Sequence, residues 1–142
     1  EVDALDRKAV KRVLFCSGKV YYDLLEARRE RQLDDCAIIR IEQLYPFPRE
    51  EIMTILASYP AVADVVWVQE EPRNQGAWSI MLSRRVLAGC FPVEMPLRCV
   101  ARAYSASPAV GYHALHLKQQ QELVDAALQA PSPTTPQQKK PA

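Results

Sequence analysis

The sequence lacks the patterns that mark most zinc, membrane and nucleic-acid-binding proteins. Its four cysteines form no C-x-x-C pair and only two histidines accompany them, which argues against a zinc site. No apolar run approaches the roughly 20 residues that cross a bilayer, and the charged stretch from Glu1 to Arg12 has no apolar core of a secretory signal. A formal net charge of +1 gives no basic surface for DNA or RNA. We therefore expect no metal site, no membrane partner and no nucleic-acid partner.

The cysteines themselves are placed like buried apolar residues. Cys16, Cys36 and Cys99 lie inside apolar runs, where a free cysteine behaves as a small hydrophobe. With Cys90 they are interpreted as four reduced thiols of a cytosol-like compartment.

What the chain does contain is an alternation of β-rich apolar runs and helical stripes. Apolar residues recur at helical spacing after Lys19, after Pro48, from Trp78 towards Gly89, and around Leu123. Strands that alternate with helices are parallel and joined by crossovers. The four predicted strands are 12–17, 36–41, 65–68 and 97–101. The sequence therefore predicts an α/β fold, a three-layer α/β/α sandwich on a mostly parallel sheet of about five strands. The fifth would be an edge strand within 90–96, although two prolines there oppose it.

The length suits one domain with flanking segments. Residues 1–10 are expected to be a linker from upstream domains, and 11–130 to form the α/β domain. Residues 131–142 hold four prolines and no large apolar side chain, so we expect a disordered tail.

Ligands of a parallel sheet bind beyond the carboxyl ends of its strands, so the loops there are the candidate sites. Glu70 and Glu71 could act as acid and base only if one were buried with a raised pKa, and neighbours in an extended segment point to opposite sides. An interface loop, with Asn74 capping the next helix, is the favoured alternative. In the following loop Ser107 before Pro108 suits a helix start.

A second set of residues could bind an anion. Gly18 and Lys19 form a turn into a helix, which can hold a phosphate, but no complete phosphate-binding motif is present. Arg40, Arg98 and Arg102 lie within or just after strands and could form an anion pocket or surface ion pairs. His113 and His116 share a helical face without further ligands, which favours surface or interface roles over metal binding.

Four blocks of sequence resemble a known family in order and spacing. They cover Cys16 to Leu24, Ile39 to Pro48, Trp67 to Trp78, and Ser105 to Gly111 with His116 and 118–121. Across residues 11–128 they resemble the C-terminal domain of the thiamine-diphosphate-dependent decarboxylase component of 2-oxoglutarate dehydrogenase, closer to bacterial members than to mitochondrial ones. One departure is Ala101-Arg102-Ala103, where many relatives have Gly-Arg-Pro. It keeps the arginine but changes the residues that set the backbone path.

The resemblance implies a fold like the C-terminal domain of transketolases and a parent enzyme of the citric acid cycle. Such a parent is a homodimer that decarboxylates 2-oxoglutarate and passes the succinyl group to a lipoyl arm of the dihydrolipoyl succinyltransferase component of a multienzyme complex. Thiamine diphosphate and Mg²⁺ would be held by domains upstream, and this domain would bind no cofactor. The location implied is the bacterial cytoplasm, or the mitochondrial matrix in a eukaryote.

We therefore expect a dimerisation and substrate-entry domain that is inactive alone and contains no catalytic residue. Its expected interface or channel residues are Glu70, Glu71, Asn74, Gln75, Arg102, Ser105 and Ser107. Two alternatives stay open. One is a regulatory module that binds AMP or acetyl-CoA through Lys19, Arg40 and Arg102. The other is a stand-alone interaction domain of a split enzyme.

Overall fold

The sheet is built around β1 (Arg12–Cys16), whose five residues are all buried. In a computed structural model, residues 1–83, 88–90, 95, 97–107 and 111–129 are described. The other elements are α1 (Val20–Glu30), β2 (Cys36–Arg40), α2 (Arg49–Ala57), β3 (Asp64–Pro72), α3 (Trp78–Ser83), the 3-10 helix η1 (Ala88–Cys90), β4 (Leu97–Arg102) and α4 (His113–Leu128). A central strand that is apolar on both faces is typical of a sheet covered by helices on both sides.

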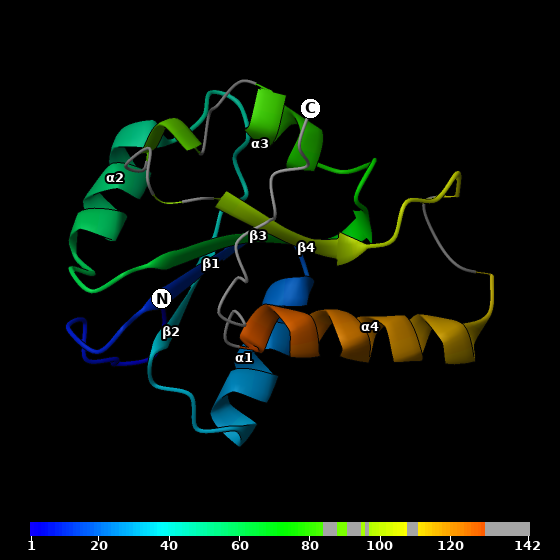
Figure 1. Cartoon of the computed structure of the whole chain (residues 1–142), viewed down its shortest axis with the longest axis horizontal. Helices are drawn as coiled ribbons and strands as arrows, with labels where there is room; N and C mark the ends of the chain where they lie inside the picture. The colour runs from blue at the N-terminus through cyan, green and yellow to red at the C-terminus, as the bar shows by residue number, and fades with distance from the viewer. Residues whose placement is uncertain (84–87, 91–94, 96, 108–110, 130–142) are drawn as a thin grey trace, which may run out of the picture.

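The strands are parallel and stand in the order β2-β1-β3-β4 (Figure 1). Arg12 of β1 lies opposite Cys36 on one side and Asp64 on the other. The predicted α/β class with a parallel sheet is confirmed, with four strands among the described residues. The fifth strand expected within 90–96 falls largely on residues outside that description, and Cys90 belongs to η1.

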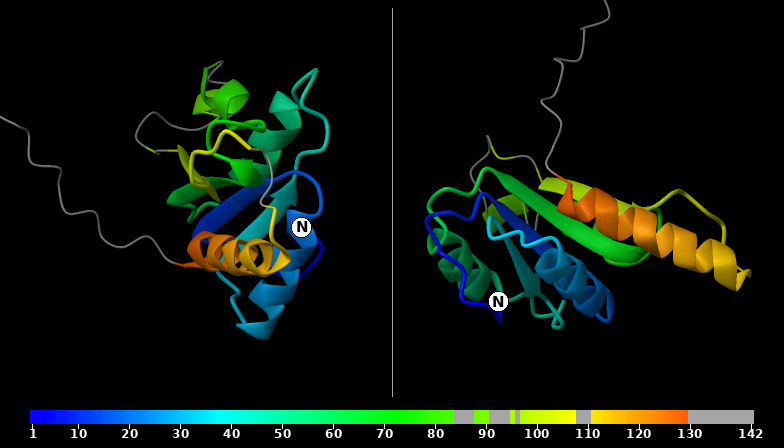
Figure 2. Two further views of the ribbon diagram at one scale, coloured as in Figure 1. Left: turned by 90° about the vertical axis from the view of Figure 1, so that its right-hand side faces the viewer. Right: turned by 90° about the horizontal axis from the view of Figure 1, so that it is seen from below.

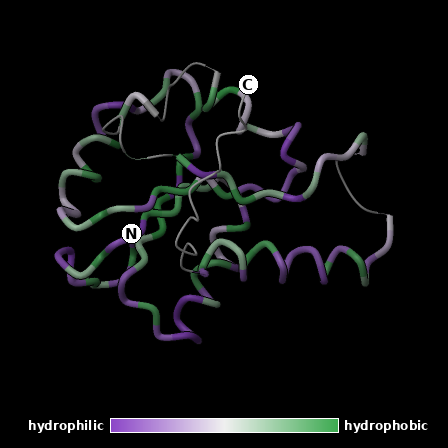
Figure 3. Tube along the Cα trace, in the orientation of Figure 1, coloured by the Kyte–Doolittle hydropathy of each residue, from purple (hydrophilic) through white to green (hydrophobic). Residues whose placement is uncertain are grey.

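Helices cover both faces of the sheet, as the two turned views show (Figure 2). Leu14 and Ile38 point to the side of α1 and α4, and their core also contains Leu24 and Val124. The alternate strand residues point to the side of α2 and α3, in a second core that includes Phe15, Ile39, Trp67, Ile52 and Met81. Hydrophobic segments accordingly fill the middle of the trace, and hydrophilic ones the outside (Figure 3). This confirms the three-layer sandwich.

Charged residues near the ends of two helices have the sign that the helix dipole favours. Helix α1 carries Arg28 and Arg29 in its last turn, and α2 carries Glu50 and Glu51 in its first. Both placements complement the helix dipole. The third predicted helix is described as α3, and its expected continuation to Gly89 includes residues 84–87, which lie outside the described chain.

The first ten residues, here called the N-terminal arm, lie on the domain. Val10 is fully buried. The Glu1 carboxylate accepts a hydrogen bond from Arg28 at 2.6 Å, and Asp3 forms ion pairs with Arg28 and Arg29. The connection of the arm to upstream domains stays a prediction. These contacts show that the arm packs against this domain. The tail expected at 131–142 lies outside the described residues.

Cys16, Cys36, Cys90 and Cys99 form no disulfide among the described residues, and their reduced state stays a prediction. Within the described part of the chain, no helix has the length and apolar character needed to cross a membrane.

Candidate functional site

The loops that follow the strands meet at the carboxyl edge of the sheet. The strand order reverses between β1 and β3, because the chain passes from β1 outward to β2 and then returns to the other side of β1. Ligand sites of parallel sheets form at such a reversal point. A cleft of about 360 Å³ lies there, between the turn at Ser17 and Gly18 and the last part of β3 at Gln69 and Glu70.

Gln69, for which the sequence predicts no role, lies beneath the β3–α3 loop and holds it in place. Its side chain is almost fully buried. Its Oε1 accepts hydrogen bonds from the Trp67 indole and from the Trp78 backbone N–H, both at 2.9 Å. Its Nε2 donates to the Gln75 carbonyl at 2.7 Å and the Pro72 carbonyl at 3.1 Å. The carboxamide therefore connects the end of β3, the loop and the first residue of α3.

This arrangement corrects the expected role of Asn74. The first N–H of α3 is bonded by Gln69, and Asn74 does not cap the helix. Instead Asn74 pairs with Ser105 in the β4–α4 loop. Its Nδ2 donates to the Ser105 carbonyl at 2.9 Å and its Oδ1 accepts the Ser105 N–H at 3.0 Å. The side-chain amide of Asn74 thus pairs with the backbone N–H and C=O of Ser105. These bonds link two loops through residues that are 31 positions apart in the sequence.

Three further contacts join the ends of β3 and β4 and the loops that follow them. The Gln75 side chain donates to the Ser105 carbonyl at 3.0 Å. The Arg102 guanidinium donates to the Glu70 carbonyl, and the Arg73 N–H donates to the Arg102 carbonyl at 3.0 Å. Five of the seven expected interface residues, Glu70, Asn74, Gln75, Arg102 and Ser105, are thus brought together.

The remaining two, Glu71 and Ser107, are less engaged. Glu71 follows Glu70 on β3 and is exposed. The Ser107 N–H donates to the Ser105 hydroxyl at 3.1 Å. The helix start expected after Ser107 falls on residues 108–110, outside the described chain, and α4 begins at His113. An interface or channel role for all seven residues stays a prediction.

Lys19 and Arg40, two of the expected anion-binding cations, are paired with acidic or aromatic groups. Lys19 contacts the Glu70 carboxylate at 2.6 Å, and this hydrogen bond is the main cause of its raised pKa. Arg40 contacts other groups than Lys19 does. It contacts Glu42 at 3.3 Å, and its guanidinium lies 5.0 Å from the ring centre of Tyr21. The N–H of Gly18, which could have bound a phosphate, donates to Glu42 at 3.1 Å.

Arg98 lies at the opposite end of the sheet and joins no pocket with Arg40 or Arg102. It forms two hydrogen bonds of 2.7 Å with Asp64, which also accepts one from Arg12 at the same distance. Burial raises the pKa of Asp64, but the two guanidinium groups outweigh it and the net pKa is lowered. These residues form a structural ion-pair cluster at the amino edge.

The described residues offer little for covalent or metal chemistry. Burial raises the pKa of the Cys16 and Cys36 thiols to about 12, so neither supplies a thiolate near neutral pH. No group of three or more His, Cys, Asp or Glu side chains in the described chain could hold a metal ion. His113 is exposed, and His116 lies in a groove between α1 and α4.

Large side chains are exposed around the same edge. Tyr104 is 74% exposed in the β4–α4 loop, and Tyr112 is 79% exposed just before α4. Leu115 and Leu117 in the first half of α4 are also exposed, and this half of the helix extends past the end of β4 (Figure 1). Such a grouping of apolar surface beside polar loops is typical of interaction sites.

Two comparisons with known proteins agree on the family. The family model described as 2-oxoglutarate dehydrogenase C-terminal matches residues 1–128. The chain is 56% identical over 128 residues to the 2-oxoglutarate dehydrogenase E1 component of Haemophilus influenzae, a match that covers 90% of this chain and 14% of that protein. It is 51% identical over 129 residues to the same component of Azotobacter vinelandii, covering 89% of this chain and again 14% of the relative.

A solved structure titled "Split gene transketolase, inactive beta4 tetramer" has a TM-score of 0.53 to this chain at 20% identity, over 83% of this chain and 38% of that one. This confirms the transketolase-like fold. The family match begins at residue 1, so it includes the N-terminal arm. The chain belongs to the 2-oxoglutarate dehydrogenase C-terminal family.

Proposed function

We propose that this domain forms part of the dimer interface and of the substrate entrance of a 2-oxoglutarate dehydrogenase decarboxylase component, and that it is inactive alone. The parent would decarboxylate 2-oxoglutarate in the bacterial cytoplasm and pass the succinyl group to the dihydrolipoyl succinyltransferase component. The observation that carries the proposal is the linked pair of loops at the carboxyl edge, with exposed aromatic side chains beside them.

The rigidity of these loops supports an interface role. Gln69 holds the β3–α3 loop from below, and Asn74 ties it to Ser105. Loops fixed before association lose less conformational entropy when they bind. Tyrosine is among the residues enriched at binding hot spots, so Tyr104 and Tyr112 are the proposed anchors.

The described residues do not fit a site for thiamine diphosphate and Mg²⁺. Magnesium needs oxygen ligands in octahedral geometry. At the carboxyl edge Glu70 pairs with Lys19, and Glu42 pairs with Arg40 and the Gly18 N–H, and no group of three or more possible ligands occurs among the described residues. We therefore place no catalytic step on this chain and assign the cofactor to the rest of the parent.

The interface can be tested in the full-length protein. Tyr112→Ser should weaken the dimer about tenfold or more, since it removes an anchor of the kind that contributes about 2 kcal/mol. Met53→Ser is the matched control, because Met53 is an exposed apolar residue on α2. Analytical ultracentrifugation measures the dissociation constant. Equal dimer strength in the two variants, and in the matching Tyr104→Ser variant, would overturn the interface role.

A further inference from the structure

The outer edge of β4 has no strand beside it among the described residues. β4 pairs only with β3 there, and all six of its residues are partly exposed. The Arg102 carbonyl accepts a hydrogen bond from the N–H of Arg73, just past β3, so the peptide group of Arg102 faces β3. Since peptide groups alternate sides along a strand, those of Cys99 and Ala101 face away from β3. Nothing in the described part of the chain pairs with them on that side.

The usual protection of an edge strand is missing from β4. Natural proteins guard such strands against further pairing with proline or with charged side chains. β4 contains no proline. Its two arginines are engaged elsewhere, Arg98 with Asp64 at 2.7 Å and Arg102 with the Glu70 carbonyl. The edge can therefore accept another stretch of backbone.

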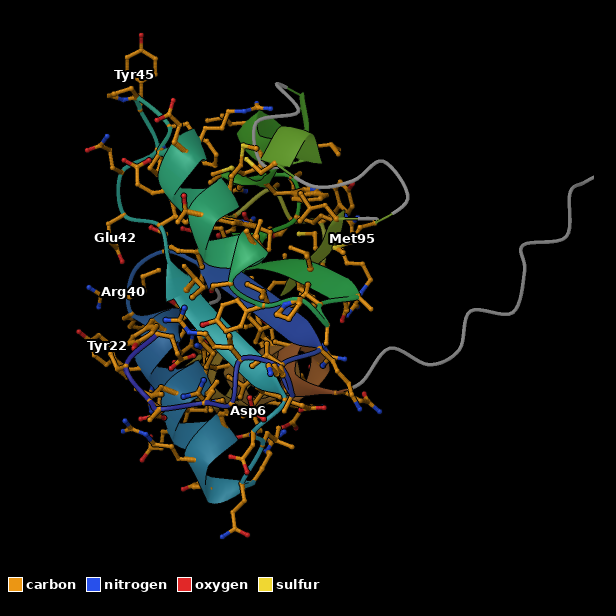
Figure 4. All side chains as sticks on the ribbon, turned by 90° about the vertical axis from the view of Figure 1, so that its left-hand side faces the viewer. Asp6, Tyr22, Arg40, Glu42, Tyr45 and Met95 are labelled. Carbon is orange, nitrogen blue, oxygen red and sulfur yellow. The ribbon has the colours of Figure 1, made fainter. Side chains whose placement is uncertain are left out.

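A groove of about 200 Å³, here called the β4–α4 groove, runs between this edge and α4. Residues 100–103 line it from the strand, and Gln119 and Leu123 are among those that line it from the helix. Side chains of a strand alternate between its two faces, so a groove lined by four consecutive residues opens on the backbone edge. This edge is remote from β2. Met95, two positions before β4, and Arg40 of β2 lie at opposite sides of the molecule (Figure 4).

Gln119 brings an unsatisfied acceptor to this groove. Its Oε1 is buried and has no hydrogen-bond partner among the described residues. A buried acceptor without a donor destabilises the fold, and buried polar groups of native proteins nearly always have a partner. The backbone N–H of an extended segment is a suitable donor, and the same segment can pair with Ala101. One occupant therefore satisfies both the buried oxygen and the open edge.

We propose that, in the longer protein, an extended segment from the part of the polypeptide that precedes this chain lies in the β4–α4 groove. One of its N–H groups donates to Gln119 Oε1, and its backbone pairs with the outward peptide groups of β4, as in recognition by strand addition. This chain spans 14% of the length of its relatives, so the rest of such a protein is long enough to supply the segment. A tethered segment also reaches the groove at a high effective concentration.

Amide hydrogen exchange resolved to single residues tests the pairing. The Ala101 amide should exchange about tenfold or more slowly in the full-length protein than in this chain alone, because it gains a hydrogen bond. Ala61 is the matched control, since it is an alanine exposed in the turn before β3 whose N–H has no partner among the described residues. Its exchange should be the same in both proteins. Equal exchange of Ala101 in both, or equal slowing of Ala101 and Ala61, overturns the proposal.

Dilution separates this proposal from the role in the dimer. The inference rests on the proposed place of this chain in a longer enzyme, but not on its dimer interface. Protection of Ala101 should persist when the full-length protein is diluted until analytical ultracentrifugation shows monomers, because the segment belongs to the same polypeptide. Protection that is lost together with the dimer would assign the groove to a second copy and overturn the proposal. Dimer strength and Ala101 exchange are measured separately, so either proposal can fail while the other stands.

A variant of Gln119 gives a second measurement. In this chain alone, Gln119→Leu removes an unpaired buried oxygen, so the thermal midpoint should stay the same or rise. In the full-length protein the same change removes the acceptor of the segment, so Ala101 exchange should become severalfold faster. Gln121→Leu, at an exposed position of α4, should alter neither quantity. A lower midpoint for the Gln119→Leu chain, or unchanged Ala101 exchange in the full-length variant, contradicts the proposal.

Discussion

At the residue scale, Gln69 is the side chain on which the candidate site depends most. A buried amide that keeps both its oxygen and its nitrogen bonded stabilises the fold, whereas its loss leaves the partners desolvated and unpaired. Gln69→Leu would leave the Trp67 indole N–H and the Trp78 N–H without their acceptor. We expect a loss of about 2 to 4 kcal/mol in the free energy of unfolding, measured by urea denaturation.

The control for that variant is Gln121→Leu. Gln121 is exposed on α4, and its side chain bonds the nearby Asp125, so its replacement should change stability by less than about 0.5 kcal/mol. If both leucine variants unfold at the same urea concentration, the Gln69 network contributes nothing to stability.

Two glycines allow a sharper comparison, because both have positive φ. Gly18 has φ +74° and open space where a Cβ would stand, while a Cβ on Gly76 (φ +64°) would lie 3.0 Å from Gln69 Nε2. Gly18→Ala therefore tests backbone strain alone, at about 1 kcal/mol. Gly76→Ala adds a steric clash with a side chain held by hydrogen bonds, for a total of about 2 kcal/mol or more. Thermal unfolding should rank Gly76→Ala as the less stable variant, and the opposite rank would contradict the packing of Gln69 beneath the loop.

At the element scale, the N-terminal arm is held by charge and should respond to pH. Hydrogen bonds from Arg29 and then Arg28 lower the pKa of Asp3 from 3.8 to about 2. A carboxyl whose pKa is lower in the folded state stabilises that state above its unfolded pKa and loses this effect as the pH falls towards the folded pKa. The contribution of Asp3 should therefore be complete above pH 3.8 and should vanish as the pH approaches 2.

The difference in urea midpoint between the unmodified chain and Asp3→Asn, measured from pH 6 to pH 2, checks this. It should be constant at the upper end and shrink through the window below pH 3.8. Asp34→Asn is the control, because Asp34 is exposed and forms no ion pair with the described residues. A difference for Asp3→Asn that does not change with pH would show that the ion pairs with Arg28 and Arg29 are absent in solution.

The sequence was most informative about the positions of the helices and strands. The runs around Leu14, Ile38 and Val66 predicted strands because continuous apolar character fits a strand buried on both faces. The helical spacing of Ile52, Ile55 and Leu56 likewise predicted α2. These patterns involve only residues close together in the sequence. They can therefore be recognised without knowing which segments pack against one another.

At the scale of the whole molecule, the chain is expected to be one part of a larger enzyme. Purified alone, with thiamine diphosphate, Mg²⁺ and 2-oxoglutarate supplied, it should release no CO₂ above background, because the described residues include no nucleophile with a base and no metal-ligand cluster. Release of CO₂ measured in a sealed-vessel assay, and retained after gel filtration, would contradict its role as a non-catalytic domain.

An antibody raised against this domain provides a second test at the same scale. In a lysate of the native cells it should detect a band several times heavier than 16.1 kDa, because the relatives are so much longer than this chain. A band at the chain's own mass would instead favour the alternative of a stand-alone domain in a split enzyme.

The sequence by itself determined the α/β class, the positions of four strands and the family, since periodicity and motif blocks are properties of neighbouring residues. It also identified Asn74 and Arg102 as residues of interest, but not their partners. Only the tertiary structure showed that Gln69 holds the loop, that Asn74 binds Ser105 and that Glu1 with Arg28 caps β2. The contacts of Asn74 and Glu1 join segments far apart in the chain that meet only when the domain folds, so no local pattern could have predicted them. The contacts of Gln69 span at most nine residues, but the burial that makes this polar side chain a structural centre is set by the tertiary structure.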